Sequence, residues 1–436
     1  MRHIHFGILV FCELMLSATA ANAQTRVSDT LSMDQVVREV VRNNDRLKAA
    51  AFMEEAARRE IGPAGAWDDP MLMLGVQNLP SSFRFDEDMM TMKMIGLSQR
   101  IPYSGEKGFQ SKSKRAAAEA VADERRQTAL DLVAAAKTAY IELYYHQRVI
   151  ADLERQRELA EQIAVSVRSR VEANLAGMDE LNAALAAMWR LDAEILTHHN
   201  DAHTAHHQLD ALRGILSPDD MPAVTPPSVA ELPDTFLVWT DSARENYAPL
   251  RQMLHQAESY RLNAIASNRM SWPMLELSAS YGIRQDLVME DGMVEPQDNM
   301  WNFAATFSLP IFKGRQEKQM ARSMTAMQRQ MEAEAAQMAK DVDAELRALH
   351  MRAEHFRDAA AMYEDKIVPA DDEAFKTALA GYSSGRTSLP DLLNYAMTTY
   401  RDRMTLTDLQ LAYASTVYRA ERYIMNAGIY VTESGE

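Results

Sequence analysis

The chain has 436 residues, a formal net charge of −16 and one cysteine, Cys12. Such acidity argues against nucleic acid and anionic membrane surfaces as partners, and it is compatible with a cation-conducting interior or simply with solubility. Because we expect the segment that holds Cys12 to be removed, the rest of the chain excludes structural disulfides, cysteine nucleophiles and thiolate metal sites.

Residues 1–23 have the pattern of a signal peptide. Basic residues near Arg2 precede a mostly apolar run over 6–16, and Ala21-Asn22-Ala23 forms an A-x-A cleavage site. An N-terminal anchor helix is the alternative, but the apolar run is shorter than the roughly 20 residues that a span needs. No apolar run of that length follows. We therefore expect an exported protein that is periplasmic, secreted or a β-barrel in the outer membrane.

The remaining sequence repeats itself at an offset of about 200 residues. The motif NNDRL at 43–47 resembles NYAPL at 246–250, and PMLML at 70–74 resembles PMLEL at 273–277. The repetition predicts one structural plan used twice, over 24–216 and 234–428. A proline-rich linker over 217–233 joins the repeats, and a tail over 429–436 ends the chain.

Each predicted repeat consists of a helix, a β-hairpin and a long helical hairpin. The first has these elements over 31–61, 69–102 and 104–216, and the second has them over 234–270, 273–310 and 314–428. The helix from 104 to about 173 contains no proline and approaches about 100 Å in length. Polar helices this long predict coiled-coil walls, with 314–380 as the counterpart.

The second hairpin alternates between apolar and small or polar residues. Apolar side chains occupy the odd positions of both strands, from Leu275 to Ile283 and from Trp301 to Leu309. This pattern is typical of transmembrane strands, and the alternative is an amphipathic hairpin on a soluble domain. In the first hairpin Leu72, Leu74 and Val76 share a face. The lipid-facing side of its second strand stays open between the set Met90, Met92, Met94 and the set Thr91, Lys93, Ile95, Leu97, Gln99.

Four strands cannot close a barrel alone, because the smallest membrane barrels have about eight. Open sheet edges are not tolerated in hydrocarbon, so the strands of several copies must be pooled. Two or three copies would both satisfy this requirement.

The repeated plan resembles the TolC family of outer-membrane factors. Within that family, DPMLMLGVQNLP (69–80) followed by MTMKMIGLSQRIPYSGEKG (90–108) resembles the cation and heavy-metal efflux branch. Turns with Pro102 and Gly105, and with Pro310 and Gly314, strengthen the resemblance, as does the Gly-x5-Asp turn that ends at Asp391.

The resemblance implies a mainly α fold with a small β part. It implies a homotrimer with a shared transmembrane β-barrel of twelve strands and a helical tunnel in the periplasm. It further implies a Gram-negative outer membrane, a periplasmic adapter (a membrane fusion protein), an inner-membrane pump of the RND type, and no cofactor. The expected function is a passive exit duct for heavy-metal cations. Multidrug efflux and type I protein secretion are alternatives within the fold, and a periplasmic coiled-coil adapter is an alternative from another class.

The same resemblance assigns the periplasmic tip, where the adapter docks and cations are selected. Asp391 matches an acidic ring at the constriction, and Asn394 falls where some relatives carry a second acid. Ala173 replaces the first-half glycine, and Asp179 keeps the acid. The implied tip residues are Asp391, Asn394, Gly385, Arg386, Asp179 and Gly177. The alternative for Asp391 is an ordinary helix N-terminal acid.

Two clusters offer metal ligands. His199, His203 and His206 share one helical face and could bind a transition metal, although solvated helix surface is the alternative. Met90, Met92 and Met94 could offer thioethers to Cu(I) or Ag(I), with packing as the alternative. No nucleophile elbow, Walker loop, dinucleotide fingerprint or zinc-protease motif is present, so we expect no enzyme.

Overall fold

The computed structural model describes residues 30–216, 221–289, 292–309 and 311–426. The expected signal peptide over 1–23 and the tail over 429–436 lie outside these residues. The helices in chain order are α2 (Met33–Asn43), α3 (Asp45–Arg59), α4 (Ile61–Gly65), α5 (Glu106–Glu172), α6 (Met178–Arg213), α7 (Leu237–Asn246), α8 (Ala248–Met270), α9 (Lys313–Met362), the π-helix η1 (Tyr363–Ile367), α10 (Val368–Ser383) and α11 (Leu389–Ile424). The strands are β1 (Met71–Gln77), β2 (Met92–Ile101), β3 (Leu275–Arg284), β4 (Leu287–Val288), β5 (Val294–Glu295) and β6 (Met300–Phe307).

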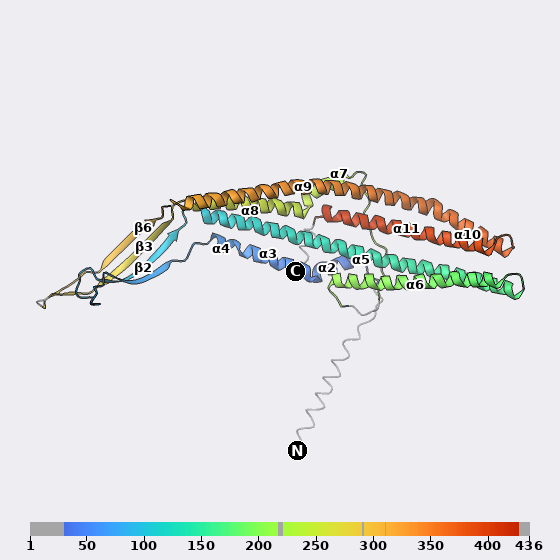
Figure 1. Cartoon of the computed structure of the whole chain (residues 1–436), viewed down its shortest axis with the longest axis horizontal. Helices are drawn as coiled ribbons and strands as arrows, with labels where there is room; N and C mark the ends of the chain where they lie inside the picture. The colour runs from blue at the N-terminus through green and yellow to red at the C-terminus, as the bar shows by residue number, and fades with distance from the viewer. Residues whose placement is uncertain (1–29, 217–220, 290–291, 310, 427–436) are drawn as a thin grey trace, which may run out of the picture. The chain divides into compact units, whose positions relative to one another are not determined.

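The same order of elements occurs twice along the chain (Figure 1). Short helices lead into a strand pair, and a long helical hairpin follows, first through α5 and α6 and then through α9 to α11. The fold is therefore mainly helical with a small β part, as the sequence predicts. Of the helices described, none combines the length and the apolar character needed to cross a membrane.

The chain forms two compact units, each built from both repeats. One unit, here the tip unit, comprises the described residues within Met1–Asn44, Leu132–Leu232 and Met351–Arg419 and contains both turns of the helical hairpins. The other, here the sheet unit, comprises the described residues within Asp45–Asp131, Pro233–His350 and Ala420–Glu436 and contains the strands.

Each short leading helix is interrupted at the repeated asparagine motif, where the sequence predicted a continuous helix. Asn44 separates α2 from α3 with ψ 123°, and Tyr247 separates α7 from α8 with ψ 104°. In the tip unit the Asn44 side-chain amide donates to the Leu212 carbonyl at 2.8 Å. In the sheet unit the Asn246 amide donates to the Ile424 carbonyl at 3.3 Å. The motif thus satisfies a terminal carbonyl of the returning helix in each repeat.

The long helix of the second repeat contains a π-helical turn that we did not predict. The N–H of Val368 bonds to the carbonyl of Tyr363, five residues earlier, at the end of η1. Pro369 has no N–H to donate to the carbonyl of Asp365 and disfavours regular α-helix just before it. The wider turn accommodates this missing bond between α9 and α10.

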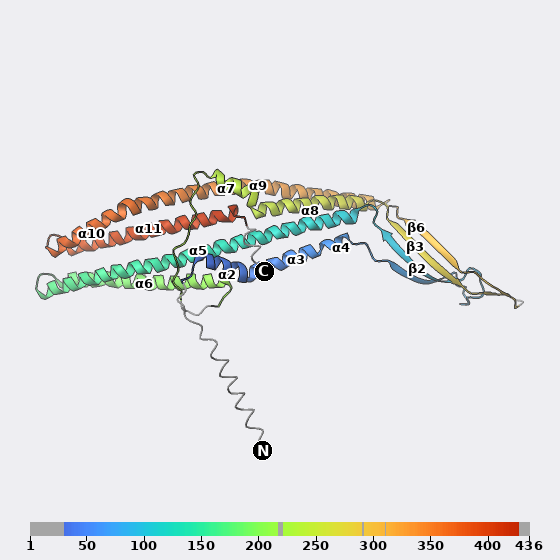
Figure 2. The same ribbon diagram turned by 180° about the vertical axis from the view of Figure 1, so that it is seen from behind.

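The sheet joins four antiparallel strands in the order β1-β2-β3-β6. Leu74, Ile95, Tyr281 and Trp301 are aligned across it by the register of the three strand pairs. Both views show β2, β3 and β6 side by side (Figures 1 and 2). Side chains paired across antiparallel strands share a face, so the register assigns every strand position to one side.

The register shows which residues of the first strand pair share a face with the apolar residues of the second pair. The apolar face carries Leu72, Leu74, Val76, Ile95, Leu97, Leu275, Leu277, Ala279, Tyr281, Ile283, Trp301, Phe303, Ala305 and Phe307. Ile95 and Leu97 therefore belong with the apolar residues of the other strands. Met92 and Met94 lie on the opposite face, beside small residues such as Gly96 and Gly282. Large apolar side chains remain exposed on the apolar face, with Phe303 at 77% and Leu74 at 70%.

Two buried tyrosines hold the described part of the linker against the long helices within the tip unit. The Tyr140 hydroxyl of α5 lies 2.8 Å from the carbonyl oxygens of Leu31 and Thr225. The Tyr418 hydroxyl of α11 donates to the Ser228 carbonyl at 2.9 Å. Because the two tyrosines come from different helical hairpins, the linker ties the hairpins together within this unit.

Candidate functional site at the helical turns

The two hairpin turns of the tip unit have the same backbone design. Asn174 follows α5 with φ 55°, and Gly385 follows α10 with φ 70°, so both are left-handed. One residue later, the Leu175 N–H bonds to the Arg170 carbonyl at 2.8 Å, and the Arg386 N–H bonds to the Gly381 carbonyl at 2.8 Å. This is a Schellman-type helix end, in which glycine and asparagine are the preferred left-handed residues.

The equivalence corrects the predicted alignment of the first turn by one residue. Asn174, and not Ala173, takes the left-handed position of Gly385. Counting onward from these positions, Glu180 rather than Asp179 is the counterpart of Asp391. The sequence alignment matched Gly385 with Ala173 and treated this position as a lost glycine. Asparagine is the other residue type that tolerates a left-handed backbone, and Asn174 is the next residue.

Asp391 is part of a cap at the start of α11. The Ser388 hydroxyl accepts the Asp391 N–H at 3.3 Å and donates to the Asp391 carboxylate at 2.6 Å. This exchange resembles a capping box, and it satisfies one of the free N–H groups of the helix. Asp391 thus has the structural role that the alternative interpretation gave it, while its side chain stays exposed.

All six predicted tip residues lie at or beside these turns and are exposed. Gly177 precedes α6, Asp179 lies in its first turn, and Gly385 and Arg386 lie between α10 and α11. Asn394 follows Asp391 by one helical turn, so the two share a face of α11. The Arg386 guanidinium makes a local bond to the Ser384 hydroxyl at 3.0 Å.

An arginine that the sequence analysis did not single out connects the two hairpins beside the turns. The Arg170 guanidinium donates to the Tyr382 carbonyl at 3.1 Å and lies 4.7 Å from the centroid of its ring. Below this contact, buried side chains from all four helices form one core: Ile163, Ala164, Val167, Leu181, Ala184, Ala378, Tyr382, Leu389 and Leu392. The two turns are therefore held side by side by packing and by one cationic contact.

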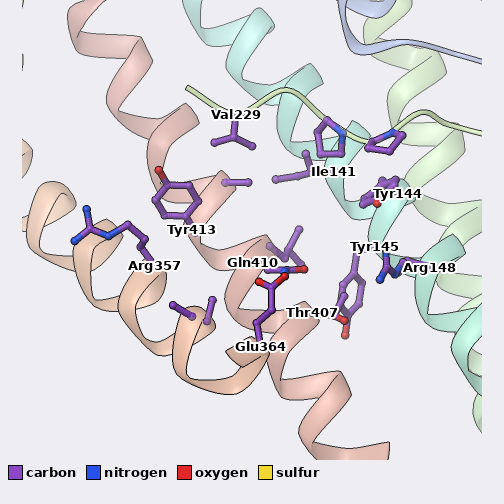
Figure 3. Close-up of a pocket in the computed structure, with 16 residues that line it drawn as sticks. Ile141, Tyr144, Tyr145, Arg148, Val229, Arg357, Glu364, Thr407, Gln410 and Tyr413 are labelled. Carbon is purple, nitrogen blue, oxygen red and sulfur yellow. The ribbon is translucent and has the colours of Figure 1, made fainter. Parts of the chain in front are cut away.

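A cavity of about 480 Å³ lies in the tip unit under the linker (Figure 3). Tyr144, Tyr145 and Arg148 of α5 face Thr407, Gln410 and Tyr413 of α11 across it, and Arg357 and Glu364 border it from the α9–η1 segment. The Tyr145 hydroxyl donates to the Asp408 carboxylate at 2.6 Å. Burial, and then the neighbouring Asp408, raise the pKa of Tyr145, so this hydroxyl remains a donor.

The predicted histidine triad does not converge. His199 is exposed, whereas His206 is fully buried with its Nε2 3.3 Å from the Asp210 carboxylate. The adjacent His198 instead meets His146 of α5, with 3.0 Å between their Nδ1 atoms. Sequence reasoning missed this pair because His146 lies on the other helix of the hairpin, far from the histidine-rich segment.

The predicted methionine set is also divided. Met90 lies in the turn before β2, so only Met92 and Met94 share a strand face. A Cβ atom at Gly282 would lie 2.5 Å from the Met92 sulfur, which shows that Met92 fills the space that this glycine leaves. Packing therefore accounts for Met92 without a metal ion.

The family of the chain is shown by a match over both repeats. The family model described as outer membrane efflux protein matches residues 36–215 and 239–422. The chain belongs to the outer membrane efflux protein family. No curated protein gives a significant match to the sequence of this outer membrane efflux protein.

Solved structures share the fold of this outer membrane efflux protein. One is CusC, whose structures concern conformational changes during folding and transmembrane channel formation. It aligns with a TM-score of 0.73 and 16% identity over 90% of this chain and 91% of its own. The outer-membrane channel OprN has a TM-score of 0.71 and 16% identity over 90% of each chain. The CmeC outer membrane channel of Campylobacter jejuni has a TM-score of 0.71 and 15% identity over 92% of this chain and 89% of its own.

Proposed function

We propose that this outer membrane efflux protein forms the outer-membrane channel of a tripartite efflux system and acts as a passive exit duct for heavy-metal cations. The observation that carries the proposal is the sheet. Its apolar face is exposed across all four strands, and β1 and β6 each have one strand partner among the described residues. An exposed apolar face suits lipid, and unpaired edges in lipid require further strands from other copies.

We propose that three copies assemble. Two copies would supply eight strands, but the interior of an eight-stranded barrel is filled by its own side chains. Three copies supply twelve strands and leave room for a duct. In this arrangement the small residues opposite the apolar face, such as Gly96, Ser280 and Gly282, line the duct.

Heavy-metal cations are the proposed cargo. The acidic residues Asp391, Asp179 and Glu180 lie in the first turns of α11 and α6, at the two hairpin turns. Three copies of Asp391 around one axis would attract cations and repel anions at the mouth of the duct. The sequence resemblance of 69–108 to the cation-efflux branch supports the same cargo.

The partners of the proposed channel are a periplasmic adapter and an inner-membrane pump, which supplies the energy for transport. Exposed apolar side chains at the first turn support adapter docking, because Leu175 is 69% exposed and Met178 is 58% exposed. Such residues in solvent mark interaction surfaces when they are grouped. A double substitution Leu175→Ser with Met178→Ser should weaken capture of the adapter, whereas the exposed Leu196→Ser on the middle of α6 should not.

A deletion strain tests the cargo. Loss of the gene should sensitise cells to divalent or soft metal ions, and the wild-type gene should restore resistance. Sensitivity to drugs with unchanged metal tolerance would contradict the metal cargo but leave the channel intact. The channel itself is tested by single-channel conductance of the purified protein in planar bilayers, where cation-selective conductance is expected.

A further inference from the structure

The hairpin of α5 and α6 holds a three-residue group whose ligand atoms converge. His146 lies on α5, and His198 and Asp201 lie on α6. One ligand atom from each lies within 4.8 Å of the other two. In the part of the chain that the structure describes, this is the one group of histidine and carboxylate side chains with that property. All three residues are partly buried, unlike His199 beside them.

The spacing fits both helices. His198 and Asp201 are three residues apart, so they share one face of α6, and His146 reaches them from the neighbouring helix. Two nitrogen ligands on a tetrahedral ion, each about 2.0–2.1 Å from it, are separated by about 3.3 Å. The observed separation of 3.0 Å between the His146 and His198 Nδ1 atoms is close to this value. Small side-chain rotations would bring the three donors to bonding distance.

The chemistry of the donors favours a borderline divalent ion. Neutral imidazole is the form that binds a metal. Two imidazoles and one carboxylate suit Zn²⁺, Cu²⁺ and Ni²⁺, whereas Mg²⁺ and Ca²⁺ prefer oxygen ligands alone. With three protein ligands, a fourth position is left for water.

We propose that His146, His198 and Asp201 form a binding site for one divalent transition-metal ion, represented by Zn²⁺, that cross-links α5 to α6. The site is independent of the cargo proposed for the channel. The bound ion replaces the direct contact between the two imidazoles. Because it joins the two helices of one hairpin, it stabilises the tip unit when the metal is present.

Zn²⁺ titration of the detergent-solubilised full-length protein, by competition with a chromogenic chelator, tests the site. One equivalent per chain should bind to the wild type, and His146→Gln with His198→Gln should abolish that equivalent. The matched control is His199→Gln with His203→Gln, which changes two histidines of the same helix and should keep it. Asp201→Asn should weaken binding without changing the oligomer mass.

A second measurement guards against misfolding of the variants. Co²⁺ added to the wild type should give visible absorption bands of a low-symmetry nitrogen and oxygen site, and Zn²⁺ should displace them. Circular dichroism and oligomer mass of the His146→Gln, His198→Gln variant should match the wild type. The proposal is overturned if the wild type binds no stoichiometric Zn²⁺. It is equally overturned if the double variant keeps the equivalent.

Discussion

The guanidinium of Arg170 lies over the ring of Tyr382 and donates to its backbone carbonyl, which joins the α5–α6 hairpin to the α10–α11 hairpin beside their turns. Arg170 lies in the last turn of α5 and Tyr382 lies in the last turn of α10, so moving these two helix ends apart would stretch this contact. If the turns move apart when the proposed channel opens, the contact favours the closed arrangement.

Arg170→Ala should therefore shift the channel toward open states. Loss of the cation–π contact and its hydrogen bond removes about 1–2 kcal/mol, or roughly a 5- to 30-fold change in an equilibrium. The expected result is a higher open probability in planar bilayers. The exposed Arg168, two residues before Arg170 and therefore on another side of α5, supplies the control, and Arg168→Ala should behave as the wild type. Equal open probabilities for Arg170→Ala and Arg168→Ala would show that the contact does not restrain the turns.

Neutralising the acidic residue Asp391 at the turn should reduce the cation selectivity of the proposed channel. Asp391→Asn keeps the size of the side chain and removes three negative charges from the proposed trimer. The reversal potential in a salt gradient should move toward anions, and the shift should diminish at high ionic strength because salt screens exposed charges. Glu373→Gln on α10, an exposed acid away from the turns, is the control. An unchanged reversal potential would remove Asp391 from the conduction path.

The left-handed backbone at Asn174 predicts opposite effects for two substitutions. Asn174→Gly should be neutral or slightly stabilising, because glycine adopts positive φ without steric cost. Asn174→Val should destabilise the turn by about 1–2 kcal/mol, because a β-branched side chain clashes in this conformation. Ala173→Val is the control, since Ala173 has no positive φ. Thermal unfolding of the three variants distinguishes the assignment of Asn174 from that of Ala173.

Removing the tyrosine hydroxyls that hold the linker should make the linker more susceptible to proteolysis. Tyr140→Phe and Tyr418→Phe each remove a hydroxyl that donates to a backbone carbonyl in or beside the linker. Each buried carbonyl left without a donor should lower the free energy of unfolding by about 1–2 kcal/mol. Limited proteolysis should cut the linker faster in both variants, and the double variant should be the most sensitive. Tyr395→Phe, an exposed tyrosine of α11, should leave the rate unchanged. A rate that does not respond to either buried tyrosine would contradict the role of these bonds.

A carboxyl pair between α10 and α11 predicts a specific pH dependence. Burial, followed by the neighbouring Asp402, raises the pKa of Asp371 above its ordinary value of 3.8. The folded state then binds this proton more tightly than the unfolded state, so the contribution of Asp371 to the free energy of unfolding is fully present below 3.8 and is lost as pH rises through the raised pKa.

Asp371→Asn should remove this penalty and raise the thermal stability at neutral pH while flattening its pH dependence. Asp372→Asn is the opposite control, because Asp372 is paired with Arg403 at 2.7 Å and its loss should destabilise the protein. If both variants shift the unfolding temperature in the same direction, the assignment of Asp371 is wrong.

Periodicity and repetition predicted the element types and their order. Alternation at Leu275–Ile283 and at the strand from Trp301 located β3 and β6, and proline-free polar sequence located α5. The first strand pair was harder, because Met90–Gln99 carries apolar residues at both even and odd positions. Its face follows only from the pairing of Ile95 with Tyr281, which is a tertiary contact.

Local sequence reasoning failed where distant partners decide the structure. The break at Asn44 depends on a carbonyl at Leu212, and the histidine contact depends on His146, which lies on another helix. Pro369 and Asn174, by contrast, carried a local signal for the π-turn and for the left-handed cap. Pro369 lacks the N–H of a regular α-helix, and asparagine, like glycine, tolerates the positive φ of a helix cap.

The central claim, that strands of several copies close one duct, is tested most directly by the mass of the detergent-extracted protein. Native mass spectrometry should give three chains per complex, and this complex should resist dissociation until it is heated. A protein that stays monomeric and dissolved in buffer without detergent would contradict the shared duct.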